Sequence, residues 1–329
     1  MRILLLVLAT LAVLPALIVW LGSQLTLDRS RAHARGTEAV PVYDGGALRE
    51  PTLVRIAARG MHFRARVAGL GADGPALVLL HGFPETSIMW EPLIERAVAA
   101  GFQVVAFDQR GYSPGARPEG IEAYRVPVLV DDILAVADAV GFDTFHLVGH
   151  DWGSIVGWAA AGAHPDRVLS WASLSIPHPA AIPEPDVEPD TPTYVKVFRV
   201  PGLAEALLGF AGRFPMHRVI WGTMSQAHHD EYEAMYSEPG ALTATLNWYR
   251  AIDPGSLPGG EMPRVRQSVL YVYGKDDIGA FVNERVQARL PQYVEGPLER
   301  IALDAGHWLI QDEEKIVVAA VMAHLERVR

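Results

Sequence analysis

The sequence predicts an α/β protein with a mostly parallel sheet, helices on both faces of that sheet, and an inserted helical segment. Two observations carry this prediction. Short continuous apolar runs, typical of strands buried on both faces, alternate with stretches of helical periodicity. One stretch, residues 178–262, breaks this alternation, because it is rich in proline, aromatic and acidic residues and has no strand-like run.

The individual elements follow from these runs. The expected strands are 54–58, 61–67, 76–80, 104–107, 145–148, 168–174, 269–273 and 300–303, and the expected helices outside the insertion are 87–100, 128–140, 154–164 and 312–328. We therefore expect a core in two parts, residues 51–177 and 263–329, with a helical cap at 178–262 inserted between them.

Composition excludes several classes of function. The 329-residue chain has a formal net charge of −10 and no cysteine. Binding to nucleic acid depends on neutralising phosphates with lysine and arginine, so the negative charge argues against a nucleic-acid partner. Without cysteine there is no disulfide, no thiolate nucleophile and no cysteine-ligated zinc.

The first 22 residues differ in composition from the rest of the chain. Between Ile3 and Leu21 only Thr10 is polar and no residue is charged. A helix over this run would span roughly 28 Å, close to the thickness of the hydrocarbon core of a bilayer. We expect an N-terminal transmembrane anchor at 1–22, followed by a polar tether at 23–50.

The alternative for this segment is a cleaved signal peptide. Its apolar core is normally shorter, and the small-x-small site Ala32-His33-Ala34 lies well beyond the apolar run. Three arginines, Arg29, Arg31 and Arg35, follow the run, and their count favours a cytoplasmic catalytic domain at the membrane.

The stretch Gly149-His150-Asp151-Trp152-Gly153 has the features of a nucleophile elbow. It follows an expected strand, precedes an expected helix and carries small residues two positions either side of Asp151. A literal G-x-S-x-G surrounds Ser113, but the proline and glycine residues after it do not begin a helix. Asp151 is therefore the candidate nucleophile, and Ser113 is expected in a loop.

Other parts of a hydrolytic site lie at the ends of further strands. His81-Gly82-Phe83-Pro84 follows the 76–80 strand, so the amides of Phe83 and Trp152 are the expected oxyanion hole. His307 lies between the last strand and the last helix, where a general base is expected. The acid that orients His307 is expected after the strand 269–273, where Asp276 and Asp277 are both candidates. The position of Asp277 relative to Gly274 favours Asp277.

We expect no metal and no cofactor. The adjacent pair His228-His229 is the only sequence feature that suggests a metal. Adjacent side chains point apart, and no third ligand recurs at a suitable spacing.

An aspartate nucleophile limits the chemistry. A carboxylate attacking a carbonyl gives a labile anhydride, whereas displacement at a saturated carbon gives an alkyl ester that water can hydrolyse. With His307 as base and Asp277 as its orienting acid, the expected reaction has two steps through such an ester. The leaving group, a halide or an epoxide oxygen, decides the substrate.

Four segments carry a family resemblance: HGFPETSIMW (81–90), DQRGYSPGARP (108–118), VGHDWGS (148–154) and DAGHW (304–308). Together they resemble the epoxide hydrolases of the α/β-hydrolase fold and the related haloalkane dehalogenases, over nearly all of residues 52–329. The resemblance implies that two cap tyrosines donate hydrogen bonds to the oxirane oxygen. Tyr249, in LNWYR, and Tyr194, ahead of Pro201-Gly202, match these positions, whereas Tyr232 and Tyr236 are expected to be structural.

The resemblance thus implies a small apolar epoxide and water as the partners of the site. The alternative is a haloalkane dehalogenase with the same Asp-His-Asp triad, although Phe83 stands where many of those enzymes carry a halide-binding asparagine. A catalytically silent, membrane-tethered binding protein is disfavoured, because nucleophile, acid and base occur in order along the chain.

Overall fold

The computed structural model describes residues 40–182, 193–208, 224–252, 262–277 and 282–329. The predicted anchor at 1–22 lies outside these residues, so it stays a prediction. Within the described residues no helix is both long and apolar enough to cross a membrane. The described end of the predicted tether lies against the sheet, where Tyr43 and Leu48 donate backbone hydrogen bonds to Arg55 and Leu70.

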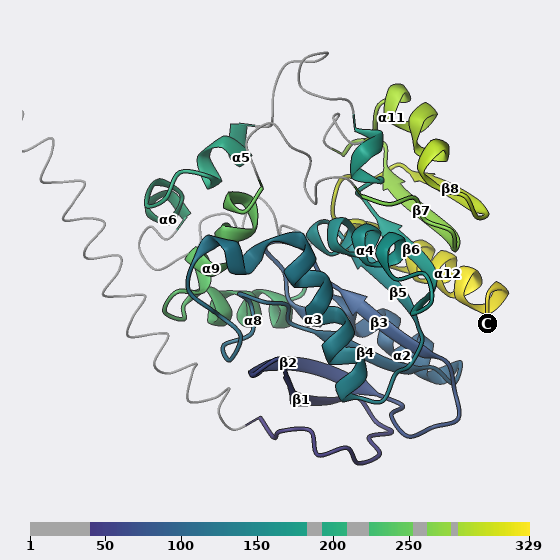
Figure 1. The fold of residues 1–329 in the computed structure, drawn as a ribbon, viewed down its shortest axis with the longest axis horizontal. Coiled ribbons are helices and arrows are strands. Elements are labelled where there is room, and N and C mark those ends of the chain that lie inside the picture. Colours follow the sequence, from purple (N-terminus) through teal and green to yellow (C-terminus); the bar gives the residue numbers. More distant parts are fainter. Residues whose placement is uncertain (1–39, 183–192, 209–223, 253–261, 278–281) are drawn as a thin grey trace, which may run out of the picture.

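An eight-stranded sheet forms the centre of the molecule (Figure 1), with the strand order β1-β2-β4-β3-β5-β6-β7-β8. Strand β2 is antiparallel to both of its neighbours, and all other pairings are parallel. The strands are β1 Thr52–Ala58, β2 Met61–Ala68, β3 Ala76–Leu80, β4 Gln103–Phe107, β5 Phe145–His150, β6 Val168–Leu174, β7 Ser268–Gly274 and β8 Leu298–Leu303. The predicted mostly parallel sheet is confirmed.

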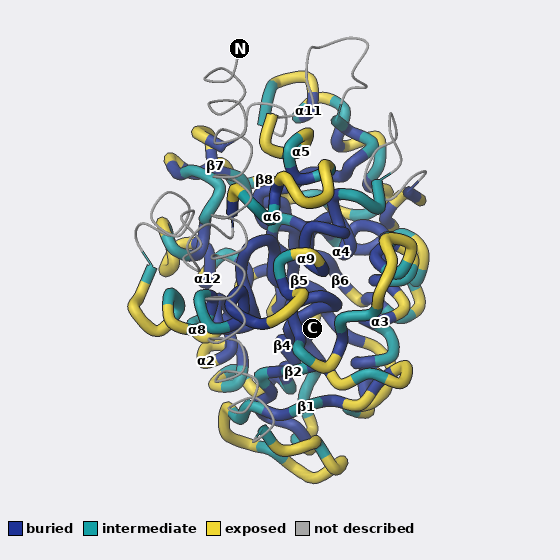
Figure 2. The backbone as a smooth tube through the Cα atoms, turned by 90° about the vertical axis from the view of Figure 1, so that its left-hand side faces the viewer, coloured by how far each residue is buried: buried dark blue, intermediate teal, exposed yellow. Residues whose placement is uncertain are grey.

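Helices cover both faces of the sheet. Alternate residues of β3 show the two layers: Leu77 and Leu79 belong to the apolar cluster that includes α2 and α12, while Val78 and Leu80 belong to the cluster that includes α3 and α4. This two-sided burial is the physical reason for the continuous apolar runs of the central strands, which are dark blue in Figure 2. The covering helices are α2 Glu91–Ala99, α3 Val126–Ala139, α4 Trp152–Ala163 and α12 Leu309–Arg327.

A helical segment lies between β6 and β7, and we name its described helices the cap. They are α5 Thr193–Phe198, α6 Leu203–Leu208, α8 Gln226–Tyr236 and α9 Ala241–Arg250. These helices gather on one side of the sheet, away from β8 (Figure 1). The remaining short helices are η1 Ser87–Trp90, η2 Ile121–Tyr124, η3 Pro179–Ala181, α11 Glu284–Arg289 and η5 Leu290–Tyr293.

Buried ion pairs attach α8 and its following loop to the core. Glu231 on α8 lies 2.7 Å from Arg64 Nη2 and 2.6 Å from Arg66 Nη2, both on β2. Glu238, just after α8, pairs with Arg117 of the core. Since each partner is largely shielded from water, these contacts fix the position of α8 over the sheet more firmly than surface ion pairs would.

Candidate active site

Asp151 occupies a strained turn between β5 and α4. Its backbone has φ +52° and ψ −118°, in the region that side-chain-bearing residues rarely adopt. A Cβ atom on Gly149 would lie 2.5 Å from the Gly153 carbonyl oxygen, and one on Gly153 would lie 2.2 Å from the Leu80 carbonyl oxygen. These close approaches explain why the turn needs small residues at both positions.

The Asp151 carboxylate lies directly against the loop after β3. The Phe83 amide donates to Asp151 Oδ1 at 2.8 Å. A Cβ on Gly82 would lie 2.6 Å from the same oxygen, so only glycine permits this approach. Trp152 begins α4, where the first amides of a helix have no intrahelical acceptor. The two predicted oxyanion-hole residues therefore flank the nucleophile candidate.

His307 lies between the two carboxylates predicted for it. His307 Nε2 is 3.3 Å from Asp151 Oδ2, and His307 Nδ1 is 2.9 Å and 3.0 Å from the two oxygens of Asp277. Asp276 instead uses its backbone amide to bond the Ala305 carbonyl. The arrangement is a carboxylate–imidazole–carboxylate row in which Asp277 fixes the orientation of the ring.

The charges in this row control its protonation. Burial alone would lower the pKa of His307, but hydrogen bonds and charges from Asp151 and Asp277 outweigh burial and raise that pKa to about 10. Burial likewise acts to raise the pKa of Asp151, yet the opposing hydrogen bond and charge of His307 leave it below its usual value. The resting site thus holds an ionised Asp151 beside an imidazolium.

Replacing Asp151 with asparagine should lower the pKa of His307 from about 10, because one of its two carboxylates loses its charge. The midpoint is measured by NMR titration of the His307 ring protons. Because the pKa of His307 is higher in the folded protein than the unfolded value of about 6.5, its protonation stabilises the fold. This stabilisation is complete below about pH 6.5 and is lost as the pH rises through about 10. The variant should show a smaller loss of stability over this range; an unchanged His307 midpoint would contradict the assigned coupling.

His150 and Glu85 form a buried network behind His307 that the sequence did not reveal. His150 Nδ1 lies 3.0 Å from Glu85 Oε2, and its Nε2 lies 2.9 Å from the His307 carbonyl oxygen. The Ser175 hydroxyl donates to the same carbonyl at 2.7 Å, and the Gln311 amide donates to Glu85 at 2.5 Å. The network joins the elbow to the loop that carries His307, so it holds Asp151 and His307 in fixed positions relative to each other.

Tyr249 of α9 packs against Trp152 and Phe83, the two residues that flank Asp151. Its ring centre is 5.0 Å from that of Trp152 and 5.4 Å from that of Phe83. Burial raises the pKa of Tyr249 well above its usual value, and the charge of Asp151 raises it further. The hydroxyl therefore stays protonated and can act as a hydrogen-bond donor.

Tyr194 of α5 reaches the same region from the outer side of the cap. Its ring centre is 6.4 Å from that of Tyr249 and 5.4 Å from that of Phe198. Burial raises the pKa of Tyr194, and the charges of Asp151 and Asp277 raise it further, although 36% of its surface is exposed. The structure thus places Tyr194 beside Tyr249, which itself packs against Trp152 and Phe83.

The other sequence candidates lie elsewhere. Ser113 is in a turn after β4, where its hydroxyl donates to the Asp108 carbonyl at 2.5 Å and accepts from the Arg64 amide. Tyr232 is fully buried, and its hydroxyl lies 3.5 Å from Glu85. Tyr236 packs edge-on against Phe83, with ring centres 6.1 Å apart. In the part of the chain that the structure describes, no cluster of three potential ligands could hold a metal.

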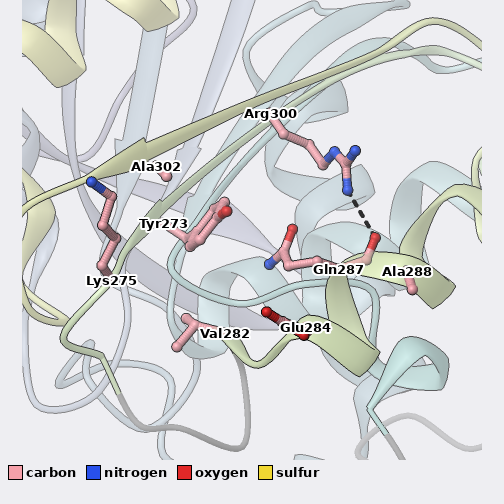
Figure 3. Close-up of a pocket in the computed structure, with 8 residues that line it drawn as sticks. All are labelled: Tyr273, Lys275, Val282, Glu284, Gln287, Ala288, Arg300 and Ala302. Carbon is pink, nitrogen blue, oxygen red and sulfur yellow. Dashed lines mark hydrogen bonds between the residues drawn. The ribbon is translucent and has the colours of Figure 1, made fainter.

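A pocket of about 600 Å³ lies away from these residues, beside β7, β8 and α11 (Figure 3). Two of its charged groups have partners: Lys275 lies 2.7 Å from Asp304, and Arg300 donates to the Gln287 carbonyl at 2.8 Å. None of the predicted site residues lines it. Its lining consists of Tyr273, Lys275, Val282, Glu284, Gln287, Ala288, Arg300 and Ala302.

Comparison with known proteins assigns the family. Residues 75–314 match the family described as alpha/beta hydrolase fold. The chain is 32% identical to Epoxide hydrolase A of Mycobacterium tuberculosis over 309 residues, covering 80% of this chain and 94% of the relative. It is also 32% identical to AB hydrolase superfamily protein YfhM of Bacillus subtilis, covering 77% of this chain and 91% of the relative. The protein belongs to the alpha/beta hydrolase fold family.

A solved structure supports the same assignment. The crystal structure of Epoxide Hydrolase A from Mycobacterium thermoresistibile is similar, with a TM-score of 0.72 and 29% sequence identity. The match covers 84% of this chain and 98% of that protein. The α/β-hydrolase fold of this chain is therefore also found in a protein named as an epoxide hydrolase.

Proposed function

We propose that this protein is an epoxide hydrolase that converts epoxides to vicinal diols through an ester on Asp151. The row Asp277–His307–Asp151, with a protonated tyrosine above it, is the observation that carries this proposal. The names of the relatives from both mycobacteria support the same substrate class.

In the first step, an oxygen of Asp151 attacks a ring carbon of the epoxide and the carbon–oxygen bond of the ring breaks. The departing oxygen takes a proton from Tyr249 or Tyr194, which become the donors for the developing alkoxide. The product is a hydroxyalkyl ester of Asp151. Both tyrosines suit this role because their raised pKa values keep the hydroxyls protonated until the alkoxide forms.

In the second step, water hydrolyses this ester. Esterification removes the charge of Asp151, so the pKa of His307 falls and its proton can return to the tyrosine phenolate through solvent. Neutral His307 then takes a proton from water, and the hydroxide attacks the carboxyl carbon of Asp151. The amides of Phe83 and Trp152 stabilise the tetrahedral oxyanion. Its collapse breaks the ester carbon–oxygen bond, and the departing alkoxide takes the proton that His307 removed from water, which gives the diol. Asp151 is released as the acid and passes its proton to His307, which restores the starting state.

The test is to supply styrene oxide and a short haloalkane to the purified protein and to measure diol and halide. Diol without halide is the expected result. Halide release would support the dehalogenase alternative, which no contact of the described site residues specifically favours. If neither diol nor halide formed, both catalytic proposals would be contradicted. The catalytically silent binding protein would then be the remaining alternative.

Replacing both Tyr194 and Tyr249 with phenylalanine should slow ring opening by about 10² to 10⁴-fold, since both proton donors are lost. Each single variant should keep part of the activity, because the other hydroxyl can still donate. The rate of ester formation in a single turnover is the measurement. Tyr273→Phe is the matched control, since Tyr273 lines the pocket of Figure 3 instead. A double variant with the control's rate would contradict the role of both tyrosines.

We further propose the N-terminal anchor at 1–22, which is supported by the sequence alone. The expected result is that the full chain stays with the membrane pellet after alkaline extraction. An N-terminus that begins just after Ala34 in the purified protein would instead support the cleaved signal peptide.

A further inference from the structure

Two arginines join the ends of the cap helices that carry the candidate proton donors. Arg199 follows α5, the helix of Tyr194, and its Nε donates to the Tyr249 carbonyl at 3.2 Å. Arg250 ends α9, directly after Tyr249, and its Nε donates to the Phe198 carbonyl at 3.2 Å. Each arginine therefore bonds the carbonyl of the residue that precedes the other arginine, and the two helices are linked reciprocally.

Both carbonyls lie at helix ends, where such donors are needed. Phe198 is the last residue of α5 and Tyr249 is the last but one of α9. The last four carbonyls of a helix have no intrahelical donor, and a positive charge at this end is favoured by the helix dipole. The pattern of an aromatic residue followed by arginine, which occurs in both helices, thus satisfies both helix ends at once.

Glu205 of α6 completes the link. It accepts hydrogen bonds from Arg250 Nη1 and Nη2, each at 2.8 Å. The Thr243 hydroxyl and the Gly202 amide also donate to Glu205, at 3.0 Å and 2.8 Å. The Arg250 side chain is only 3% exposed, so water screens this forked ion pair less than it screens a surface pair. We name Arg199, Glu205 and Arg250 the arginine clamp.

The position of α5 depends on the clamp more than that of α9 does. The core holds α9 directly, because the Trp248 indole donates to the Arg110 carbonyl at 2.9 Å. By contrast, α5 has only six residues, and a helix this short is not stable without contacts to the rest of the protein. In the part of the chain that the structure describes, α5 packs mainly against α6 and α9 (Figure 1), the two helices that the clamp joins to it.

Phe198 connects the clamp with the two tyrosines. Its carbonyl is bonded by Arg250, and its ring packs edge-on against both tyrosines. The ring centre of Phe198 is 5.4 Å from that of Tyr194 and 5.0 Å from that of Tyr249. The two tyrosine rings have their centres 6.4 Å apart. A shift of α5 would therefore change the separation of the tyrosines directly.

We propose that the arginine clamp is a positioning device, which holds Tyr194 beside Tyr249 so that both hydroxyls can donate to the same departing epoxide oxygen. Arg250 is its central residue, since it joins α9 to both α5 and α6. The clamp acts through Tyr194 and not on the reacting atoms. This inference rests on the proposed epoxide hydrolase function.

Replacing Arg250 with methionine tests the clamp, because methionine keeps an apolar stem and loses every hydrogen bond of the guanidinium. Ester formation should slow by about 10- to 100-fold, since misplacing a reacting group by about 1 Å can cost up to about 10²-fold. Ester hydrolysis should not change, because His307 and Asp277 lie outside the cap. Both rates come from quenching a single turnover at successive times and measuring the mass of the protein.

Arg167→Met is the matched control. Arg167 also bonds a carboxylate and a backbone carbonyl, those of Asp138 and Phe142, at 2.5 Å and 3.1 Å. It directly precedes β6 and therefore lies at the opposite end of the parallel strands from Asp151. Its replacement removes the same kinds of contact, and neither ester formation nor ester hydrolysis should change.

Variants of the two tyrosines separate positioning from a general loosening of the cap. In a Tyr194→Phe protein, Arg250→Met should cause no further slowing, because the hydroxyl that the clamp positions is already absent. In a Tyr249→Phe protein, the same replacement should slow ester formation at least as much as in the parent, since Tyr194 is then the remaining donor. Equal slowing in both proteins, or equal slowing of ester formation and ester hydrolysis, would overturn the proposal.

Glu205→Gln tests the same clamp if Arg250→Met does not fold. Glutamine keeps the size of the side chain but not its charge, so the slowing should be smaller and should again require the Tyr194 hydroxyl. A slowing that persists in the Tyr194→Phe protein would contradict the clamp here as well.

Hydrogen exchange distinguishes failure of the clamp from failure of the proposed function. In either clamp variant, the amides of residues 193–208 should exchange faster than in the parent, whereas those of residues 145–163 should not change. A parent that forms neither ester nor diol would contradict the proposed function. An active parent in which Arg250→Met leaves both exchange and ester formation unchanged would contradict the clamp alone.

Discussion

Replacing His307 with glutamine should trap the ester on Asp151. Glutamine keeps much of the shape of the histidine but cannot take a proton from water, so the first step proceeds and the second stops. Steady-state diol formation should fall by at least about 10⁴-fold, as is typical for loss of a member of a catalytic triad. Mass spectrometry of the protein after mixing with epoxide should show a gain equal to the mass of one epoxide, located on the peptide that contains Asp151.

His62→Gln provides the control for this result. His62 is an exposed histidine on β2, so its replacement should leave both the rate and the mass unchanged. A His307→Gln protein that still turns over, or that loses activity without gaining mass, would contradict the role of His307 as the base of the second step.

Replacing Asp151 with asparagine should abolish both steps. The amide is a poor nucleophile, so neither ester nor diol should form, and the loss of rate should again be about 10⁴-fold or more. The fold should remain, because asparagine has nearly the same size and shape as aspartate and fits the same turn at φ +52° and ψ −118°. The measurement combines circular dichroism with a single-turnover assay.

Asp276→Asn is the matched control for this aspartate. Asp276 follows the same strand as Asp277 but bonds through its backbone amide, so its side chain should be dispensable. An Asp151→Asn protein that forms diol at the control's rate would rule out Asp151 as the nucleophile.

The sequence predicted the sheet well because burial on both faces leaves a simple pattern. All five residues of β3 are buried, and the unbroken apolar run Ala76–Leu80 is typical of a strand covered by helices on both sides. The elbow was equally visible, since the close contacts of Gly149 and Gly153 can be met only by glycine. The position of Asp277 relative to Gly274 also favours it over its neighbour Asp276, and His307 contacts Asp277.

Contacts between distant segments could not be predicted in the same way. The Glu85–His150–His307 network joins positions 65 and 157 residues apart, and no local pattern indicates such partners. Sequence position alone suggests a structural or surface role for His150; it is fully buried and supports the His307 loop. The ion pairs of Glu231 with Arg64 and Arg66 were missed for the same reason, because each residue alone resembles an ordinary surface charge.

The covalent ester on Asp151 is the central claim, and a single turnover in water enriched with heavy oxygen tests it most directly. Enzyme in excess over epoxide is mixed in this water, and the peptide containing Asp151 and the diol are analysed by mass spectrometry. Because water attacks the carboxyl carbon of the ester, the label should enter Asp151, and the first diol should carry the unlabelled oxygen of the aspartate. Label that enters the first diol and leaves Asp151 unlabelled would contradict the ester and indicate direct attack of water on the epoxide.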